Sequence, residues 1–121
     1  MTGVLVVDDE ADMRVLVEAM IEQANEGLTV VGSATTGVEA IEQWRATDPD
    51  VILLDHMMPD MTGLEAAETI LAEEPEQCII LFSAFLDAAT HERASAMGIR
   101  ECLPKKDLSR VPEALWRCGS D

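Results

Sequence analysis

Residues 51–55 read Val-Ile-Leu-Leu-Asp, four consecutive apolar side chains followed directly by an aspartate. Continuous apolarity over four or five residues is typical of a strand covered on both faces, as in the parallel sheets of α/β proteins. Similar runs occur at 4–7, at 78–82 and, in shorter form, at 102–103. We therefore predict four buried parallel strands, with the more polar segment 28–34 as a fifth strand nearer an edge.

Between these runs the apolar residues recur at steps of three and four, which places them on one face of a helix. The clearest set is Met13, Leu16, Val17, Met20, Ile21 and Ala24. Weaker sets occur in the segments 38–44, 64–71, 88–97 and 111–118. Because five strands alternate with five helices, and each parallel connection needs a right-handed crossover, we predict a doubly wound five-stranded parallel α/β sheet.

Polar side chains follow the strand ends of this predicted sheet. We expect the flavodoxin-like strand order 2-1-3-4-5, in which ligands gather beyond the carboxyl ends of the strands where the winding reverses. The residues at that edge are Asp8, Asp9, Asp55, Ser83 and Lys105. We therefore expect these five side chains to meet in one cleft.

Three carboxylates in one cleft repel one another, at about 4 kcal/mol for like charges ~4 Å apart and an effective dielectric near 20. Lys105 offsets part of this repulsion, and Mg²⁺ offsets more because it prefers oxygen ligands and accepts phosphate oxygens. A carboxylate can accept a phosphoryl group, so Asp55 is the candidate nucleophile, with Asp8 and Asp9 holding the metal. The Ser83 hydroxyl and the Lys105 ammonium are then placed to contact phosphoryl oxygens.

The segments that carry this chemistry resemble the receiver domains of two-component response regulators, in the chemotaxis-regulator-like superfamily. They are Asp8-Asp9, Asp55-His56-Met57-Met58-Pro59, Gly63, Ser83-Ala84 and Leu103-Pro104-Lys105. The resemblance covers nearly the whole chain and implies that Asp55 is the phospho-acceptor and that Ser83 and Lys105 contact the phosphoryl group. The metal ligands that it implies are Asp8, Asp9, Asp55 and the backbone carbonyl of Met57.

By this resemblance the chain is a phosphorylation-dependent signalling switch rather than an enzyme, although it assists its own phosphorylation and dephosphorylation. A sensor histidine kinase or a phosphotransfer protein is the expected donor. The expected readout surface is formed by the helix at 88–97, the strand at 102–103 and the helix at 111–118, which would contact a downstream protein or a second copy. We expect residues 1–121 to form a receiver domain alone, without an output domain.

Two positions depart from the family pattern. Cys102 stands where receivers usually carry Tyr or Phe, so the aromatic switch of the family does not carry over. Lys106 stands where the family generally has a proline after a cis bond, and a cis bond without proline costs about 2.5 to 4 kcal/mol. Either the fold holds that strain or the bond is trans and Lys105 approaches the cleft differently. Phe85 could replace the missing ring, but we favour core packing for it.

Three further side chains lie near the candidate site. Met57 and Phe85 follow Asp55 and Ser83 by two residues, positions where the resemblance implies control of water's access to the acyl phosphate. Both are large and apolar, which predicts slow self-dephosphorylation. His56 alternates with Asp55 along the strand and so points away from it, and we expect a packing or surface role.

Composition limits the classes of function. The 121 residues suit one domain and carry 24 acidic against 8 basic residues, a formal net charge of −16. This charge repels a phosphate backbone, so we expect no direct contact with nucleic acid, and most carboxylates should be solvated surface. There is neither a charged leader nor an apolar span near 18 residues, which predicts a cytoplasmic protein away from the membrane. Cys78, Cys102 and Cys118 lack metal-ligand spacing, and we expect reduced thiols.

Two other functions remain open. A haloacid-dehalogenase-like phosphohydrolase also combines an aspartyl nucleophile with Mg²⁺, but its two catalytic aspartates lie two residues apart, whereas Asp8 and Asp9 are adjacent, and the chain has no room for a substrate cap. A receiver-like interaction module that works without phosphorylation is favoured by the departures at Cys102 and Lys106. The argument against this module is that a protein without phosphoryl chemistry would have no physical reason to keep three repelling carboxylates together.

Overall fold

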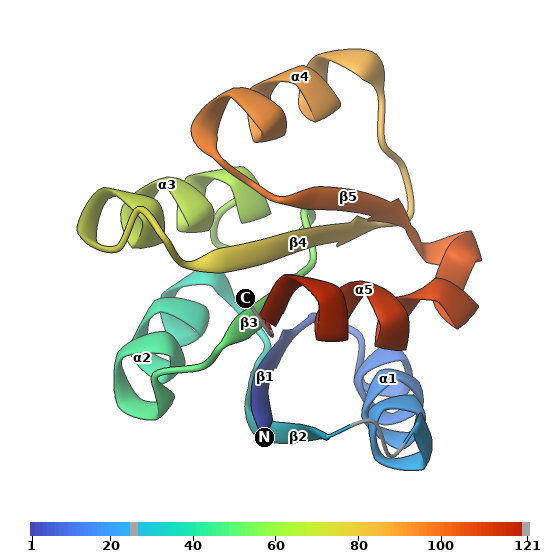
Figure 1. The fold of residues 1–121 in the computed structure, drawn as a ribbon. Helices are drawn as coiled ribbons and strands as arrows, with labels where there is room; N and C mark the ends of the chain where they lie inside the picture. The colour runs from blue at the N-terminus through green and yellow to red at the C-terminus, as the bar shows by residue number, and fades with distance from the viewer. Residues whose placement is uncertain (25–26, 120–121) are drawn as a thin grey trace.

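A computed structural model describes residues 1–24 and 27–119. Its sheet has five strands: β1 (Thr2–Val7), β2 (Leu28–Ala34), β3 (Val51–Leu54), β4 (Cys78–Ser83) and β5 (Glu101–Pro104). The strands are parallel and lie in the order β2-β1-β3-β4-β5 (Figure 1), which confirms the predicted order. The strand at 28–34 lies at an edge of the sheet, as its polar residues indicated.

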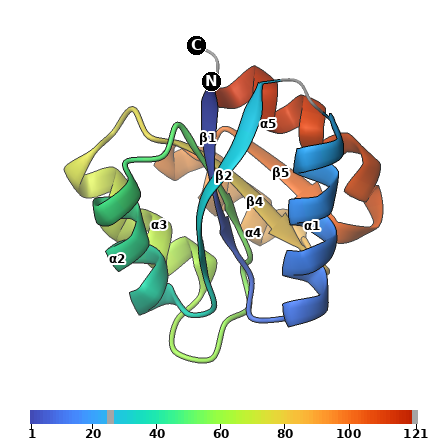
Figure 2. The same cartoon turned by 90° about the horizontal axis from the view of Figure 1, so that it is seen from below.

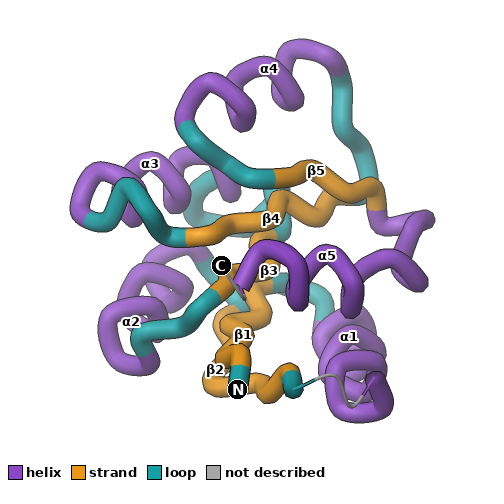
Figure 3. The backbone as a smooth tube through the Cα atoms, viewed as in Figure 1, coloured by secondary structure: helices purple, strands orange, loops and turns teal. Residues whose placement is uncertain are grey.

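Helices alternate with the strands along the chain (Figure 3). They are α1 (Ala11–Ala24), α2 (Gly37–Thr47), α3 (Gly63–Glu73), α4 (Ala88–Met97) and α5 (Val111–Gly119). A 3₁₀ segment, η1 (Lys105–Arg110), leads from β5 to α5, and the sequence pattern did not indicate it. Side-chain oxygens of Thr36, Thr62 and Asp87 accept a backbone hydrogen bond at the starts of α2, α3 and α4, which fixes where these helices begin.

The helices cover both faces of the sheet. Helices α1 and α5 pack on one face, and α2, α3 and α4 pack on the other (Figure 2). Successive residues of the buried strands point to opposite faces of the sheet. Val4 packs with α1 and α5, whereas Leu5 packs with α2 and α3. In α1 the structure buries Val17 and Ile21, but Leu16, predicted on the same apolar face, is 46% exposed.

Two cysteines are paired, contrary to the expected reduced thiols. Cys78 at the start of β4 forms a disulfide with Cys118 near the end of α5, their Cα atoms being 6.0 Å apart. Cys102 is a free thiol. The pairing was not visible in the sequence because 40 positions separate the two residues, and only the packing of α5 across the sheet brings them together.

None of the helices in the two described ranges has the length and apolar character that crossing a bilayer requires.

Candidate functional site

The residues predicted from the strand ends meet at one edge of the sheet. The Asp55 amide donates to the Val7 carbonyl at 3.0 Å, so the end of β3 lies directly beside the end of β1. A cleft of about 240 Å³ opens there. Its lining residues are Asp9, Glu10, Asp55, Met57, Ser83, Ala84, Phe85 and Lys105. The parallel sheet therefore brings four separate segments of the sequence together in one acidic site.

Lys105 is the cation at the centre of this site. Its Nζ lies 2.8 Å from Asp8 Oδ2, 3.4 Å from Asp55 Oδ1 and 3.5 Å from Glu10 Oε1. Asp8 and Asp55 are only 2% and 4% exposed, so little solvent screens their interactions with Lys105, whereas Glu10 is exposed. Burial alone would lower the pKa of Lys105, but its close contact with the Asp8 carboxylate and the charges of Asp55, Asp8 and Glu10 raise it above the ordinary value.

The charge on Asp55 is disfavoured by the protein groups around it. Burial, followed by the negative charge of Asp8, raises the pKa of Asp55 to about 7, while Lys105 acts in the opposite direction. Lys105 therefore offsets only part of the effect of burial and of Asp8 on Asp55. Additional positive charge near Asp55 would favour its ionised form.

The peptide bond between Lys105 and Lys106 is trans, as are the other peptide bonds of the described residues. This decides between the two geometries left open by the sequence. Lys105 reaches both Asp8 and Asp55 without the cis bond that is general in the family that the chain resembles.

The acidic residues of the cleft suit a hard divalent cation. One carboxylate oxygen each of Asp8, Asp9 and Glu10 lies within 4.8 Å of the others. Asp8 Oδ2 is buried and, although it faces the Lys105 ammonium, accepts no well-aligned hydrogen bond from the described residues. Closely spaced oxygen donors with unused acceptor capacity fit Mg²⁺. Glu10 was not singled out from the sequence, and its position directly after Asp8-Asp9 is the signal that could have found it.

The Ser83 hydroxyl is turned toward the loop that follows β4. Its Oγ donates to the Phe85 carbonyl at 3.2 Å and lies 3.4 Å from the Phe85 amide, which donates to it. The Phe85 ring is 76% exposed, so the expectation that it packs in the core is wrong. It lies instead on the loop between β4 and α4, where it borders both the acidic cleft and a groove of about 430 Å³. The other residues of that groove are Ala84, Leu86, His91, Cys102, Pro104 and Lys106.

The loop between β3 and α3 is closed at its base. The Gly63 amide donates to the His56 carbonyl at 2.6 Å, and Met57 pairs with Thr62 in an isolated bridge. A Cβ atom on Gly63 would overlap the Asp55 carbonyl oxygen, so this position requires glycine on steric grounds. Met57 is 65% exposed at the rim of the acidic cleft.

His56 lies outside the cleft lining, in agreement with its predicted orientation. Its Nδ1 is buried and has no hydrogen-bond partner among the described residues. Burial, followed by the positive charge of Arg93 on α4, lowers the pKa of His56, so the neutral imidazole is favoured. These features fit a packing role.

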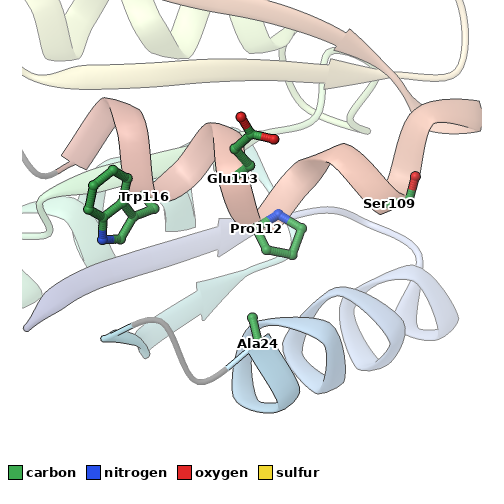
Figure 4. A pocket seen from close by; sticks show the side chains of 5 residues that line it. All are labelled: Ala24, Ser109, Pro112, Glu113 and Trp116. Carbon is green, nitrogen blue, oxygen red and sulfur yellow. The ribbon is translucent and has the colours of Figure 1, made fainter.

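Another hollow, of about 380 Å³, lies between the end of α1 and α5 (Figure 4). Figure 4 shows Pro112 and Trp116 on α5 facing Ala24 on α1, with Ser109 and Glu113 completing the lining. It contains none of the residues that the strand ends bring together, so the acidic cleft remains the candidate site.

Comparison with known proteins agrees with the geometry. The family model of the response regulator receiver domain matches residues 4–115. The chain is 38% identical to the chemotaxis protein CheY of Thermotoga maritima, over 93% of this chain and 92% of that protein. It is 43% identical to a protein-glutamate methylesterase/protein-glutamine glutaminase of Idiomarina loihiensis, over 88% of this chain but only 28% of that protein.

Solved structures give the same result. The signal receiver domain of the putative response regulator NarL from Mycobacterium tuberculosis superposes with a TM-score of 0.90 at 30% identity, over 98% of this chain and 96% of that one. The response regulator domain of Thermotoga maritima CheB superposes with a TM-score of 0.90 at 27% identity, over 100% and 98% of the two chains. This chain belongs to the response regulator receiver domain family.

Proposed function

We propose that this chain is a cytoplasmic, phosphorylation-dependent switch of a two-component system, in which Asp55 accepts a phosphoryl group from a histidine kinase or a phosphotransfer protein. The observation that carries the proposal is the cleft at the strand ends, where Asp55 lies 3.4 Å from Lys105 and beside the carboxylates of Asp8 and Asp9. Ser83 lines the same cleft. A nucleophile, a cation and a hydroxyl donor thus face one space.

In the proposed transfer a carboxylate oxygen of Asp55 attacks phosphorus. The new P–O bond forms as the P–N bond to the donor imidazole breaks, and the electron pair of that bond stays on the imidazole nitrogen. Asp55 must be ionised to attack, and because burial and Asp8 raise its pKa, a cation bound beside it would favour the reactive form. The proposed ligands are Asp8, Asp9, Asp55 and the backbone carbonyl of Met57, and Mg²⁺ held by them supplies positive charge to the phosphoryl oxygens.

Lys105 and Ser83 have different proposed roles. Lys105 places its ammonium on one phosphoryl oxygen, for which its contact with Asp55 already positions it. Ser83 donates its hydroxyl to another, and to do so it must leave the Phe85 carbonyl. Loss of that hydrogen bond frees the loop between β4 and α4. This couples the cleft to the face formed by α4, β5 and α5, where a downstream protein or a second copy would bind.

The methylesterase relative does not make this chain an enzyme. The match covers 28% of that protein, so its named activity belongs to a protein more than three times the matched length. The alternative to the phosphorylated switch is a receiver-like module that binds partners without phosphorylation. Cys102 in β5 favours this alternative, because no aromatic ring is present there to move inward when Ser83 turns.

Intact mass spectrometry after incubation with Mg²⁺ and phosphoramidate tests the proposal. We expect the parent and an Asp87→Asn control, which neutralises an exposed carboxylate outside the cleft, to gain one phosphoryl group. Asp55→Asn should gain none. A parent that remains unmodified with phosphoramidate, acetyl phosphate and a cognate kinase would contradict the switch and support the module.

A further inference from the structure

The loop between β3 and α3 is tied to α2 by a single carboxylate. Asp60 Oδ1 accepts a hydrogen bond from the Gly37 amide at 2.8 Å, and Oδ2 accepts one from the Val38 amide at 2.9 Å. Both amides belong to the first turn of α2, where backbone donors have no partner within the helix. The negative charge also faces the positive end of the helix dipole. One side chain therefore joins two segments that are 22 and 23 positions apart.

A second contact supports this tie. The side chain of Met61 lies over Gly37 so closely that a Cβ atom there would overlap its Cγ and Sδ. Helix α2 also has a cap of its own, because the Thr36 hydroxyl accepts from the Glu39 amide at 3.1 Å. Asp60 is therefore not the only cap of α2, and its distinctive effect is to fix the loop.

The loop that Asp60 holds begins beside the proposed acceptor. Met57 follows Asp55 by two residues and pairs with Thr62 at the base of the loop. With its base closed and its tip fixed to α2, the segment has two separate restraints. Asp60 provides the hydrogen bonds that restrain the tip. Asp60 is not among the residues that line the cleft.

We propose that Asp60 is a positioning residue for the Mg²⁺ site, which fixes the loop so that the Met57 backbone carbonyl is held in place for the metal. The inference rests on the proposed function, since it assumes that this carbonyl is a ligand. Without the tie the loop must be ordered when the metal binds, and that ordering opposes binding. Groups that orient ligands from outside typically change metal affinity 10- to 100-fold, and we expect the lower end because the Met57–Thr62 pairing remains.

The test is Mg²⁺ binding by calorimetry at 0.15 M salt, combined with amide hydrogen exchange, on the full chain. We expect Asp60→Ala to raise the Mg²⁺ dissociation constant roughly tenfold and to speed exchange at Gly37, Val38 and Met57. Asp60→Asn retains one oxygen acceptor and should lie between Asp60→Ala and the parent. Thr36→Ala removes the helix's own cap, and Asp87→Asn removes a comparable exposed charge.

The outcomes separate this inference from the proposed function. Both controls should bind Mg²⁺ within about twofold of the parent, even where Thr36→Ala lowers the melting temperature as much as Asp60→Ala does. A parent that binds Mg²⁺ while Asp60→Ala binds equally well would overturn the positioning role and leave the proposed function standing. If Thr36→Ala weakened Mg²⁺ binding as much as Asp60→Ala does, Asp60 would act only as a helix cap. A parent that neither binds Mg²⁺ nor becomes phosphorylated would overturn both.

Discussion

Asp55 lies between a like charge on Asp8 and an opposite charge on Lys105, in a position almost closed to solvent. Such a group is poised, because a small change in the surrounding charge alters whether it is ionised. Lys105 alone leaves the pKa of Asp55 at about 7, whereas the same lysine with a divalent cation would lower it. We therefore expect the proposed metal binding to be coupled to the ionisation of Asp55.

This coupling gives a pH dependence in the metal-free protein. The pKa of folded Asp55, about 7, lies above the ordinary 3.8, so its contribution to stability is complete below pH 3.8 and is lost as the pH rises through 7. Asp55→Asn does not titrate, and each pKa unit is worth about 1.4 kcal/mol. In EDTA we expect Asp55→Asn to exceed the parent in free energy of unfolding by up to about 4 kcal/mol at pH 8, and by less at pH 5. Urea unfolding measures this, and a difference independent of pH would contradict it.

Two exposed apolar side chains at the cleft rim are expected to slow loss of the phosphoryl group. Met57 and Phe85 are 65% and 76% exposed, so their substitution should not cost core packing. We expect the double variant Met57→Asn, Phe85→Ala to admit water and to lose phosphate about tenfold faster, equivalent to about 1.4 kcal/mol in the barrier. The decay of the phosphorylated species by intact mass measures the rate. Val38→Ala, another exposed apolar position, is the control, and an unchanged rate in the double variant would count against the effect.

The elements differ in how far the sequence alone predicts them. The runs 4–7, 51–54 and 78–82 are apolar on both faces, and both faces of the corresponding strands are covered by helices. The segment η1 has no such pattern, because its six residues are too few for a repeat and only Leu108 packs against the core. The prediction that Phe85 packs in the core was wrong for a related reason. Phe85 follows a buried strand closely, but it lies on the loop, where an apolar side chain can be exposed.

The disulfide between β4 and α5 depends on how these two elements pack, and the sequence pattern does not indicate it. Closing a loop of about 40 residues restricts the unfolded chain, and its loss should lower the free energy of unfolding by about 2–4 kcal/mol. We expect Cys118→Ser to show this loss in urea unfolding without reductant, with Cys102→Ser as the matched control.

Thiol counting tests the pairing directly. Denatured protein kept from reductant should react with N-ethylmaleimide at Cys102 alone, and after reduction at Cys78 and Cys118 as well. Three reactive thiols before reduction would contradict the disulfide.

At the scale of the whole molecule, alternation of strand and helix was sufficient to predict both the fold and the convergence of Asp8, Asp55 and Lys105, because a parallel sheet gathers its strand ends at one edge. The tie from Asp60 to α2 was not predictable, since hydrogen bonds between two loops leave no periodic pattern. The trans bond after Lys105 also needed the structure, because the residues alone allowed both geometries.

The proposed switch connects the cleft to a distant face through the Ser83–Phe85 hydrogen bonds. Beryllofluoride with Mg²⁺ should mimic the phosphoryl group and, as Ser83 turns toward it, change amide exchange in the loop at 84–87 and in α4 and β5. Ser83→Ala should bind beryllofluoride yet show less than half of this change. Full propagation in Ser83→Ala would exclude the hydroxyl as the trigger.

The central claim, that Asp55 is the phosphoryl acceptor, is tested most directly by locating the modified residue. Borohydride reduces an acyl phosphate on aspartate to homoserine, which peptide mass spectrometry detects at a single position. After incubation with Mg²⁺ and phosphoramidate, we predict homoserine at position 55 in the parent and at no position in Asp55→Asn. Homoserine at position 8 or 9, or none in a parent that binds Mg²⁺, would contradict the account.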